Sequence, residues 1–289
     1  MKKLFSKFTL TTGIAGWAML ASATDLPGPI VTTEWLAANL QNVQIVDVRS
    51  NAKSFAELPE FETDAKTGKK TLQSIGGHIT GATLIDFKAI RTERQIGELK
   101  VKYMIPEQAA WEKLARTAGI NANKPIVLVP VGLDTADVDE ALRVYWQFKV
   151  YGENNVAVLD GGMAEWLIEG RPFDQSAIKT NVAGNWAAKG DLSSQYLATS
   201  EDVAQAIANQ SATTIDARDL KSYFGLTTKL SASRKISSNV RLRSCPLANG
   251  IMQKLHIALQ PSWILSKARV ESGSAKCGRS KSPRAIVFV

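Results

Sequence analysis

The chain has 289 residues, a length that suggests about two domains. Hydrophobic residues make up 45% of it, which excludes a collagen-like chain, a wholly disordered chain and a membrane bundle. The net charge of +8 arises in the tail from Lys229 onward, which holds twelve of the 35 basic residues and a single acid, Glu271. Such a tail can bind nucleic acid or membranes, but no groove-reading motif accompanies it, so we expect no nucleic-acid partner.

The N-terminus has the features of a secretory signal peptide over residues 1–23. Its positive charges are Lys2, Lys3 and Lys7. An uncharged, mostly apolar stretch follows from Phe8 to Leu20, and Ala21-Ser22-Ala23 provides the small residues that a signal peptidase requires. The alternative is a membrane anchor, for which the stretch is short against the roughly 20 apolar residues needed. We expect export, to the periplasm if the source is Gram-negative, with no membrane span after cleavage.

Cysteine and histidine are scarce. Cys245 and Cys277 could form a disulfide after export, and His78 and His256 are too far apart for a His-rich metal site. We therefore expect neither a metal nor a cofactor.

From Thr32 onward, apolar runs of strand length alternate with helical patterns. The expected helices are Thr32–Leu40, Pro106–Ala118, Ala136–Tyr151 and Met163–Glu169. The expected strands are Gln44–Arg49, Ala82–Phe87, Pro125–Pro130 and Val156–Asp160. Ser50–Gly77 is a long polar connection. The alternation predicts an α/β fold with a parallel sheet of about five strands flanked by helices.

The pattern then begins again. Ser200–Asn209 resembles Thr33–Asn42, and Thr213–Arg218 resembles Gln44–Arg49, which indicates a duplicated domain. We accordingly expect a first domain over residues 29–173 and a linker over residues 174–196. The start of a second copy follows over residues 197–228, and a basic tail that we expect to be disordered covers residues 229–289.

Four motifs, in this order, resemble the rhodanese (thiosulfate sulfurtransferase) family in its tandem two-domain form. They are Ile45–Arg49, Gly77–Ala82 with Thr80 in place of a proline, Val158–Gly162 followed by Trp166, and Ile215–Arg218 followed by Tyr223-Phe224-Gly225. The resemblance covers roughly residues 30–228. It implies structural roles for the signature residues Asp47, Arg49, His78, Gly81, Asp160, Gly161, Gly162, Asp216 and Arg218. Asp47 is expected to hold nearby loop backbone, His78 to be a turn residue, and Gly161 and Gly162 to supply positive φ.

The resemblance also implies sulfur transfer. A cysteine after the central strand takes sulfur from thiosulfate as a persulfide and passes it to cyanide or a thiol. In the first domain the nucleophile should lie at about Pro130–Gly132, where the sequence has no cysteine. This domain is therefore expected to be non-catalytic, as the first domain of tandem members generally is.

The second copy should hold the nucleophile, but its pattern fails after Thr228, either by a frame shift or by real divergence. Cys277 is the remaining catalytic candidate, yet it precedes the strand-like run Ile286–Val289, after which the nucleophile would be expected. We expect a sulfurtransferase by ancestry whose present chain lacks the nucleophile. A non-catalytic binding module that holds a partner or an anion is the alternative. A phosphatase-like use of the fold is disfavoured, because it also needs a loop cysteine.

Overall fold

The computed structural model of the protein describes residues 25–68, 70–177, 183–216, 243–244, 268–269 and 284–288. The expected signal peptide, Arg218, Cys245 and Cys277 lie outside the described residues, as does most of the basic tail. Within the part that is described, no helix is both long and apolar enough to cross a membrane.

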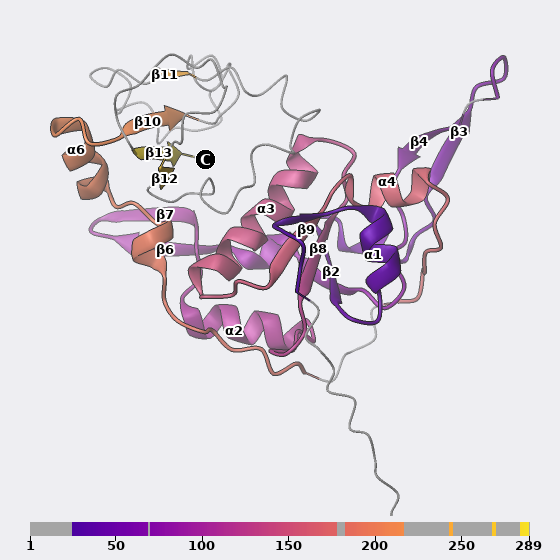
Figure 1. Cartoon of the computed structure of the whole chain (residues 1–289), viewed down its shortest axis with the longest axis horizontal. Coiled ribbons are helices and arrows are strands. Elements are labelled where there is room, and N and C mark those ends of the chain that lie inside the picture. Colours follow the sequence, from indigo (N-terminus) through magenta and orange to yellow (C-terminus); the bar gives the residue numbers. More distant parts are fainter. Residues whose placement is uncertain are drawn as a thin grey trace, which may run out of the picture.

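A five-stranded sheet forms the centre of the first domain (Figure 1). Its strands, in spatial order, are β1 (Ile30–Val31), β9 (Val156–Leu159), β8 (Ile126–Pro130), β2 (Gln44–Arg49) and β5 (Thr83–Asp86). Every neighbouring pair is parallel. All five residues of β8 are buried, as expected for an apolar run in the middle of a parallel sheet. The predicted parallel α/β sheet of about five strands is confirmed.

Helices cover both faces of this sheet (Figure 1). Side chains of a strand alternate between the faces, so Leu128 joins one core and its neighbour Val127 the other. The core that contains Leu128 is covered by α2 (Gln108–Thr117) and α3 (Thr135–Val150). The core that contains Val127 is covered by α1 (Thr33–Asn39) and α4 (Gly162–Ile168). These four helices correspond to the predicted ones.

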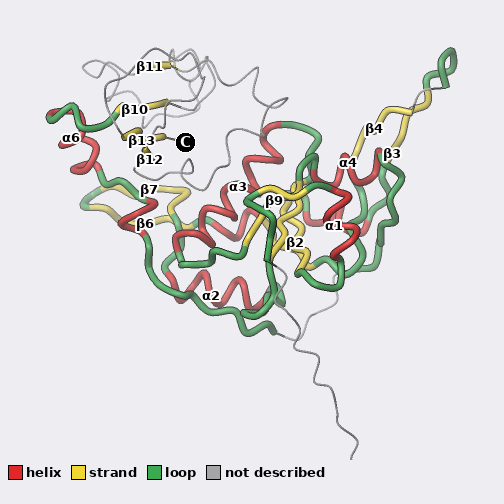
Figure 2. Tube along the Cα trace, in the orientation of Figure 1, coloured by secondary structure: helices red, strands yellow, loops and turns green. Residues whose placement is uncertain are grey.

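Two antiparallel hairpins were not expected from the sequence (Figure 2). The first pairs β3 (Glu60–Thr63) with β4 (Lys70–Ser74), inside the segment interpreted as a polar connection, and the second pairs β6 (Thr92–Ile96) with β7 (Leu99–Met104). Short 3₁₀ helices precede them, η1 (Ala52–Ala56) and η2 (Phe87–Ile90). Both hairpins project from the sheet, so their residues are largely exposed.

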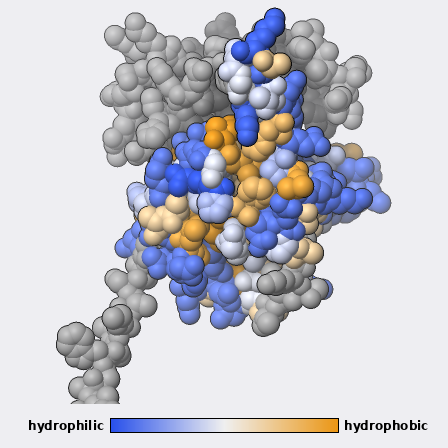
Figure 3. Space-filling model, turned by 90° about the vertical axis from the view of Figure 1, so that its right-hand side faces the viewer, coloured by the Kyte–Doolittle hydropathy of each residue, from blue (hydrophilic) through white to orange (hydrophobic). Residues whose placement is uncertain are grey.

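The face of the molecule that carries α4 and the first hairpin also shows apolar residues between its charged ones (Figure 3). Leu58 and Phe61, before and within β3, are 66% and 42% exposed, and Ile168 at the end of α4 is 61% exposed.

The segment expected to be a linker packs against the first domain. Trp186 is 0% exposed and belongs to the core beneath α2 and α3. Its N–H donates to the carbonyl of Ile120 at 3.0 Å, and its carbonyl accepts from Arg116 Nε at 2.8 Å. The short helix α5 (Ser193–Tyr196) follows it and contacts α3. The packed unit thus extends beyond Phe173.

Elements of the expected second copy come next. They are α6 (Ser200–Ala208), β10 (Thr213–Asp216), β11 (Arg243–Ser244), β12 (Ala268–Arg269) and β13 (Arg284–Phe288). Strand β10 pairs in parallel with β11 on one side and β13 on the other, while β12 is antiparallel to β13. In the first domain, β2 likewise lies between β5 and β8.

Candidate functional site

The loop after β8 is the place where the sequence predicted that the family nucleophile should lie. It runs through Pro130-Val131-Gly132-Leu133-Asp134 into α3 and packs against the turn between β9 and α4. A Cβ on Gly132 would lie 2.5 Å from the carbonyl oxygen of Gly161, and a Cβ on Gly162 would lie 2.4 Å from that of Pro130. Glycine at both positions allows the two backbones to approach this closely.

Gly161 and Gly162 both have positive φ, +67° and +60°, as the sequence predicted. The Ala164 N–H, in the first turn of α4, donates to the carbonyl of Val131 at 3.0 Å. The turn and the loop therefore hold one another in place at the carboxyl edge of the sheet.

A side-chain carboxylate accepts hydrogen bonds from the backbone amides of this loop. Asp137 Oδ2 accepts hydrogen bonds from the backbone N–H groups of Leu133 at 2.9 Å and Asp134 at 3.3 Å. In return, Asp134 Oδ1 accepts from the Asp137 N–H at 3.0 Å, which completes a capping box at the start of α3. An anion at a helix N-terminus is favoured by the free amides and by the helix dipole. Here the chain supplies that anion itself.

The same edge of the sheet carries further acidic side chains. Glu140 Oε1 accepts a short hydrogen bond from Ser50 Oγ, and its pKa is raised chiefly by burial. Burial also raises the pKa of Asp137, while the loop amide of Leu133 opposes the rise. Two carboxylates thus lie at this edge of the sheet, and the loop from Pro130 to Asp134 has no cysteine or basic residue.

A buried ion pair lies at the neighbouring strand end. Arg49 Nε donates to Asp47 Oδ1 at 2.6 Å, and Arg49 Nη2 donates to Oδ2 at 2.5 Å. Burial raises the pKa of Asp47, and the Arg49 guanidinium opposes this rise. Arg49 also donates to Ser54 Oγ at 2.9 Å and to the Gly77 carbonyl at 3.0 Å.

The resemblance implied that Asp47 holds nearby loop backbone, and in the structure Asp47 binds Arg49, which donates to the Gly77 carbonyl. The physical reason is that the Gly77 carbonyl needs a donor and an ionised carboxylate only accepts. Asp47 acts indirectly, by holding the guanidinium.

His78 lies in the turn that follows this carbonyl. It is 3% exposed, its Nδ1 lies 2.9 Å from the Phe55 carbonyl oxygen, and its ring stacks on Phe55 with centroids 3.7 Å apart. Its backbone exchanges two hydrogen bonds with Asp174. These contacts fit the structural role expected for His78. Gly81, three residues on, has φ +85°, and a Cβ at this position would have no neighbouring atom within 4 Å.

The other predicted signature residues are more dispersed. Asp160 is exposed, and its N–H donates to the Val31 carbonyl at 2.9 Å, which joins β9 to β1. Asp216 lies in β10, opposite Phe288 of β13. Among the described residues, no group of three or more His, Cys, Asp or Glu side chains is arranged to hold a metal ion.

Sequence reasoning missed the roles of Asp137 and Glu140. A signal for the first was present, since Asp134 and Asp137 have the spacing of a capping box. No sequence pattern predicts the hydrogen bond of Glu140, because its partner Ser50 is 90 residues away along the chain.

Comparison with known proteins gives the family. A family model described as "Rhodanese-like domain" matches residues 32–169. Thiosulfate sulfurtransferase of Rattus norvegicus is 26% identical over 212 residues, 73% of this chain and 66% of that protein. The 3-mercaptopyruvate sulfurtransferase of Escherichia coli strain K12 is 24% identical over 184 residues, 61% of this chain and 59% of that protein. The match thus spans about three fifths to two thirds of the length of these relatives.

Solved structures show the shared fold. The 3-mercaptopyruvate sulfotransferase SseA from Escherichia coli matches with a TM-score of 0.52 and 21% identity, over 70% of each chain. The Tum1 protein from Saccharomyces cerevisiae matches with a TM-score of 0.54 and 12% identity, over 84% of this chain and 75% of that one. Residues 32–169 thus form a rhodanese-like domain, and the relatives named above that resemble this chain are sulfurtransferases.

Proposed function

We propose that this chain is an exported member of the sulfurtransferase family whose first rhodanese-like domain is non-catalytic. The observation that carries this proposal concerns the loop after β8. There the N–H groups of Leu133 and Asp134 donate to the Asp137 carboxylate rather than to a thiolate. A persulfide mechanism needs a cysteine whose thiolate those amides would stabilise. A carboxylate in that place raises the energy of any second anion nearby.

The strand order around β10 supports a duplicated second module. The backbone of Asp216 pairs with Phe288 of β13, just as the backbone of Asp47 pairs with Val129 of β8. In this alignment β13 is the second central strand, and Cys277 precedes it in sequence. The family nucleophile follows the central strand, so Cys277 is not in the position that the mechanism requires.

Sulfur transfer is tested directly by thiocyanate formation from cyanide, with thiosulfate and 3-mercaptopyruvate as separate donors. We expect the purified chain, Cys277→Ser and Cys245→Ser to give the same background rate, with rat thiosulfate sulfurtransferase as the positive control. Robust turnover that Cys277→Ser abolishes would contradict the proposal.

Export is tested on the same protein. The charged start, the apolar stretch and Ala21-Ser22-Ala23 place the mature N-terminus at Thr24. N-terminal sequencing of protein from the exported fraction should read Thr24-Asp25-Leu26. An intact Met1 on cytoplasmic protein would contradict export.

The second candidate function is a non-catalytic binding module. It is favoured by a cavity in the first domain that lies away from the loop after β8 and carries two arginine side chains. An inactive chain that binds a ligand at this cavity would support this function over sulfur transfer.

A further inference from the structure

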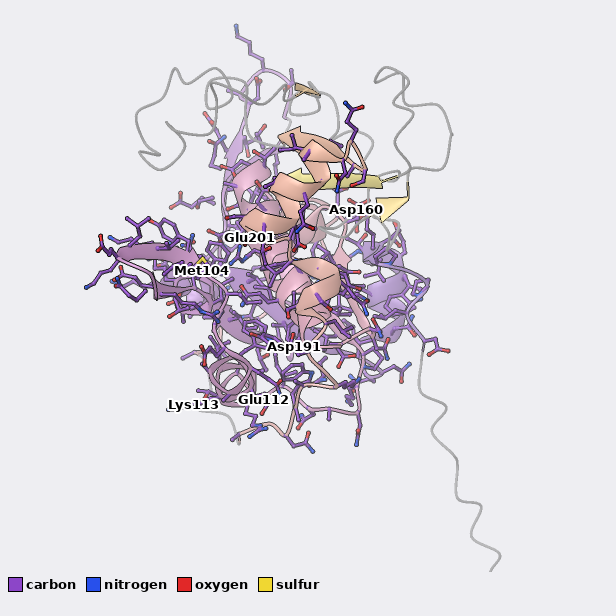
Figure 4. All side chains as sticks on the ribbon, turned by 90° about the vertical axis from the view of Figure 1, so that its left-hand side faces the viewer. Met104, Glu112, Lys113, Asp160, Asp191 and Glu201 are labelled. Atoms are coloured by element: carbon purple, nitrogen blue, oxygen red, sulfur yellow. The ribbon has the colours of Figure 1, made fainter. Side chains whose placement is uncertain are left out.

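A cavity of about 490 Å³ lies between the segment that joins η2 to β6 and the first turns of α2. Its lining residues are Ala89, Arg91, Thr92, Glu93, Arg94, Pro106, Glu107, Ala109, Ala110 and Leu114. A smaller hollow of about 220 Å³ shares Arg91, Thr92 and Glu93 with it and adds Lys88, Lys102 and Tyr103. Figure 4 views this side of the molecule, with Met104 at the end of β7 and with Glu112 and Lys113 on α2.

Two arginines in the wall have unused donors. The Nε atoms of Arg91 and Arg94 are buried and have no hydrogen-bond partner among the described residues. A buried donor without an acceptor costs about 1–3 kcal/mol, more for a charged group. Because these Nε atoms are closed to a water-sized probe, an anion in the cavity would be recognised through the charge of the two guanidinium groups that line it.

The guanidinium of Arg91 is held by aromatic rings. Its Cζ lies 4.4 Å from the ring centroid of Phe87 and 4.6 Å from that of Tyr103. Tyr103 has φ +64°, a conformation that is uncommon outside glycine, and its carbonyl accepts from Arg143 Nη2 at 3.0 Å. Rings can satisfy the face of a guanidinium, whereas its N–H edge needs an oxygen acceptor.

The wall itself carries two arginines and two glutamates, and further positive charges lie near Arg91, with Lys88 and Lys102 in the smaller hollow that it also lines. Burial, together with the charge of Arg91, lowers the pKa of Arg143 to about 10. Of the two carboxylates in the wall, Glu93 lies 4.0 Å from Lys100, and Glu107 is an exposed N-cap whose side chain makes no capping hydrogen bond. The first turn of α2 contains no acidic residue. Its amides therefore add a partial positive charge beside the arginines.

The wall also has an apolar part, beside the polar Thr92. Ala109 and Ala110 lie in the first turn of α2, Leu114 lies in the next turn, and Ala89 lines the cavity from η2. These side chains offer no hydrogen bond, so they suit a carbon skeleton rather than a free inorganic ion.

We propose that this cavity is a binding site for a small organic oxyanion, with its carboxylate or phosphate group at Arg91 and Arg94 and its apolar part against Ala109, Ala110 and Leu114. The site is separate from the loop after β8, and the proposal does not depend on sulfur transfer. An oxyanion would accept from both arginines, and charge-assisted bonds of this kind are the stronger class of hydrogen bond.

The test is binding to the full chain, measured by ligand-observed NMR with phenyl phosphate, benzoate and benzyl alcohol. We expect one or both anions to bind and neutral benzyl alcohol to bind at least about tenfold more weakly, because it lacks the charged acceptor. Inorganic phosphate should bind more weakly than phenyl phosphate. The comparison of phenyl phosphate with benzoate distinguishes a phosphate from a carboxylate ligand.

Matched variants locate the site. Arg94→Gln should weaken anion binding about tenfold or more, whereas Lys113→Gln, which removes a charge from the outer surface of α2, should leave it unchanged. Ala110→Glu keeps both arginines and brings a carboxylate to the first turn of α2, so it should block binding without lowering the melting temperature. The proposal is overturned if neither anion binds, if benzyl alcohol binds as tightly, if Lys113→Gln weakens binding as much as Arg94→Gln, or if folded Ala110→Glu binds normally.

Discussion

The Asp137 carboxylate accepts a hydrogen bond of 2.9 Å from the backbone N–H of Leu133, in the loop that follows the central strand. The N–H of Asp134 donates to the same oxygen. An internal carboxylate thus interacts with the positive end of α3, and we expect it to stabilise this helix.

Asp137→Ala should therefore destabilise the fold. Losing a helix cap lowers the free energy of unfolding by about 0.5–2 kcal/mol, because the amides of Leu133 and Asp134 lose their acceptor. Urea denaturation measures the change. Thr135→Ala, at an exposed position of the same turn, is the control and should stay within about 0.5 kcal/mol. Equal effects of the two substitutions would show that the capping box of Asp134 and Asp137 contributes nothing to stability.

Glu140 makes stability depend on pH. Its pKa is raised by burial, lowered by the Ser50 hydrogen bond and raised again by the charge of Asp137, with a net rise. Because the folded pKa exceeds the unfolded value of about 4.3, folding favours the protonated form. The associated stability is present below the unfolded pKa and is lost as the pH rises through the folded one.

Glu140→Gln should accordingly be more stable than the unaltered chain at neutral pH, since it cannot ionise and retains an acceptor for Ser50. The difference should shrink as the pH falls toward about 4. Urea midpoints across this range provide the measurement, with exposed Glu57→Gln as the control. A difference that stays constant with pH would contradict the assignment.

The buried pair of Asp47 and Arg49 should be costly to break. Asp47→Asn leaves the Arg49 charge without its carboxylate, and such single changes cost about 3–5 kcal/mol. Thermal and urea unfolding of Asp47→Asn, Arg49→Met and the double variant complete a mutant cycle. The double variant should be less destabilised than the sum of the singles. Lys100→Gln, which removes an exposed pair with Glu93, should cost less than about 1 kcal/mol. Strict additivity in the cycle would refute the coupling.

Much of the parallel sheet could be predicted from the sequence, because β8 and β9 are continuous apolar runs, as fully buried strands require, and β2 has an apolar run that ends in charged residues. A threonine cap at Thr32 or Thr33 was also recognisable, and in the structure Thr32 is the cap, with its Oγ1 accepting from the Trp35 N–H at 3.2 Å. By contrast, β1 has only two residues, too few for any periodicity.

The two hairpins could not be predicted, because their strands lack a buried face. Every residue of β3 is exposed, so its sequence resembles a polar loop, and its structure rests on backbone pairing with β4. The candidate anion cavity was missed for a related reason. Arg91 and Arg94 are ordinary charged residues in sequence, and their significance arises only where the second hairpin meets α2.

Gly162 should tolerate no side chain. In Gly162→Ala the new Cβ would lie 2.4 Å from the Pro130 carbonyl oxygen and 2.9 Å from its Cγ, at φ +60°. Gly81→Ala is a matched control, since it has φ +85° with open space around the Cβ. The control should lower the free energy of unfolding by about 1–2 kcal/mol, the cost of the left-handed backbone conformation for a residue with a Cβ. Gly162→Ala should lower it clearly more, because the backbone must also move. Equal losses in urea denaturation would mean that the loop and the turn are not in contact.

Trp186 connects the segment after Phe173 to the first domain. Its ring is fully buried, makes an edge contact with Phe148 at 5.3 Å, and donates from Nε1 to Glu153 Oε2 at 3.1 Å. Trp186→Ala should lower the free energy of unfolding by about 3–5 kcal/mol, because it leaves a cavity and an unpaired buried carboxylate oxygen.

The control for this prediction is Trp186→Phe, which keeps an aromatic ring against Phe148 and removes the hydrogen bond to Glu153. It should lose less stability than the alanine variant, because most of the apolar contact is retained. Limited proteolysis provides an independent measurement. In the unaltered chain the segment around Trp186 should stay attached to the resistant fragment, whereas in Trp186→Ala cleavage should move to the N-terminal side of Gly184, since the segment would no longer be held against Ile120. Cleavage near Phe173 in the unaltered chain, with no loss of stability in Trp186→Ala, would show that this segment is a linker after all.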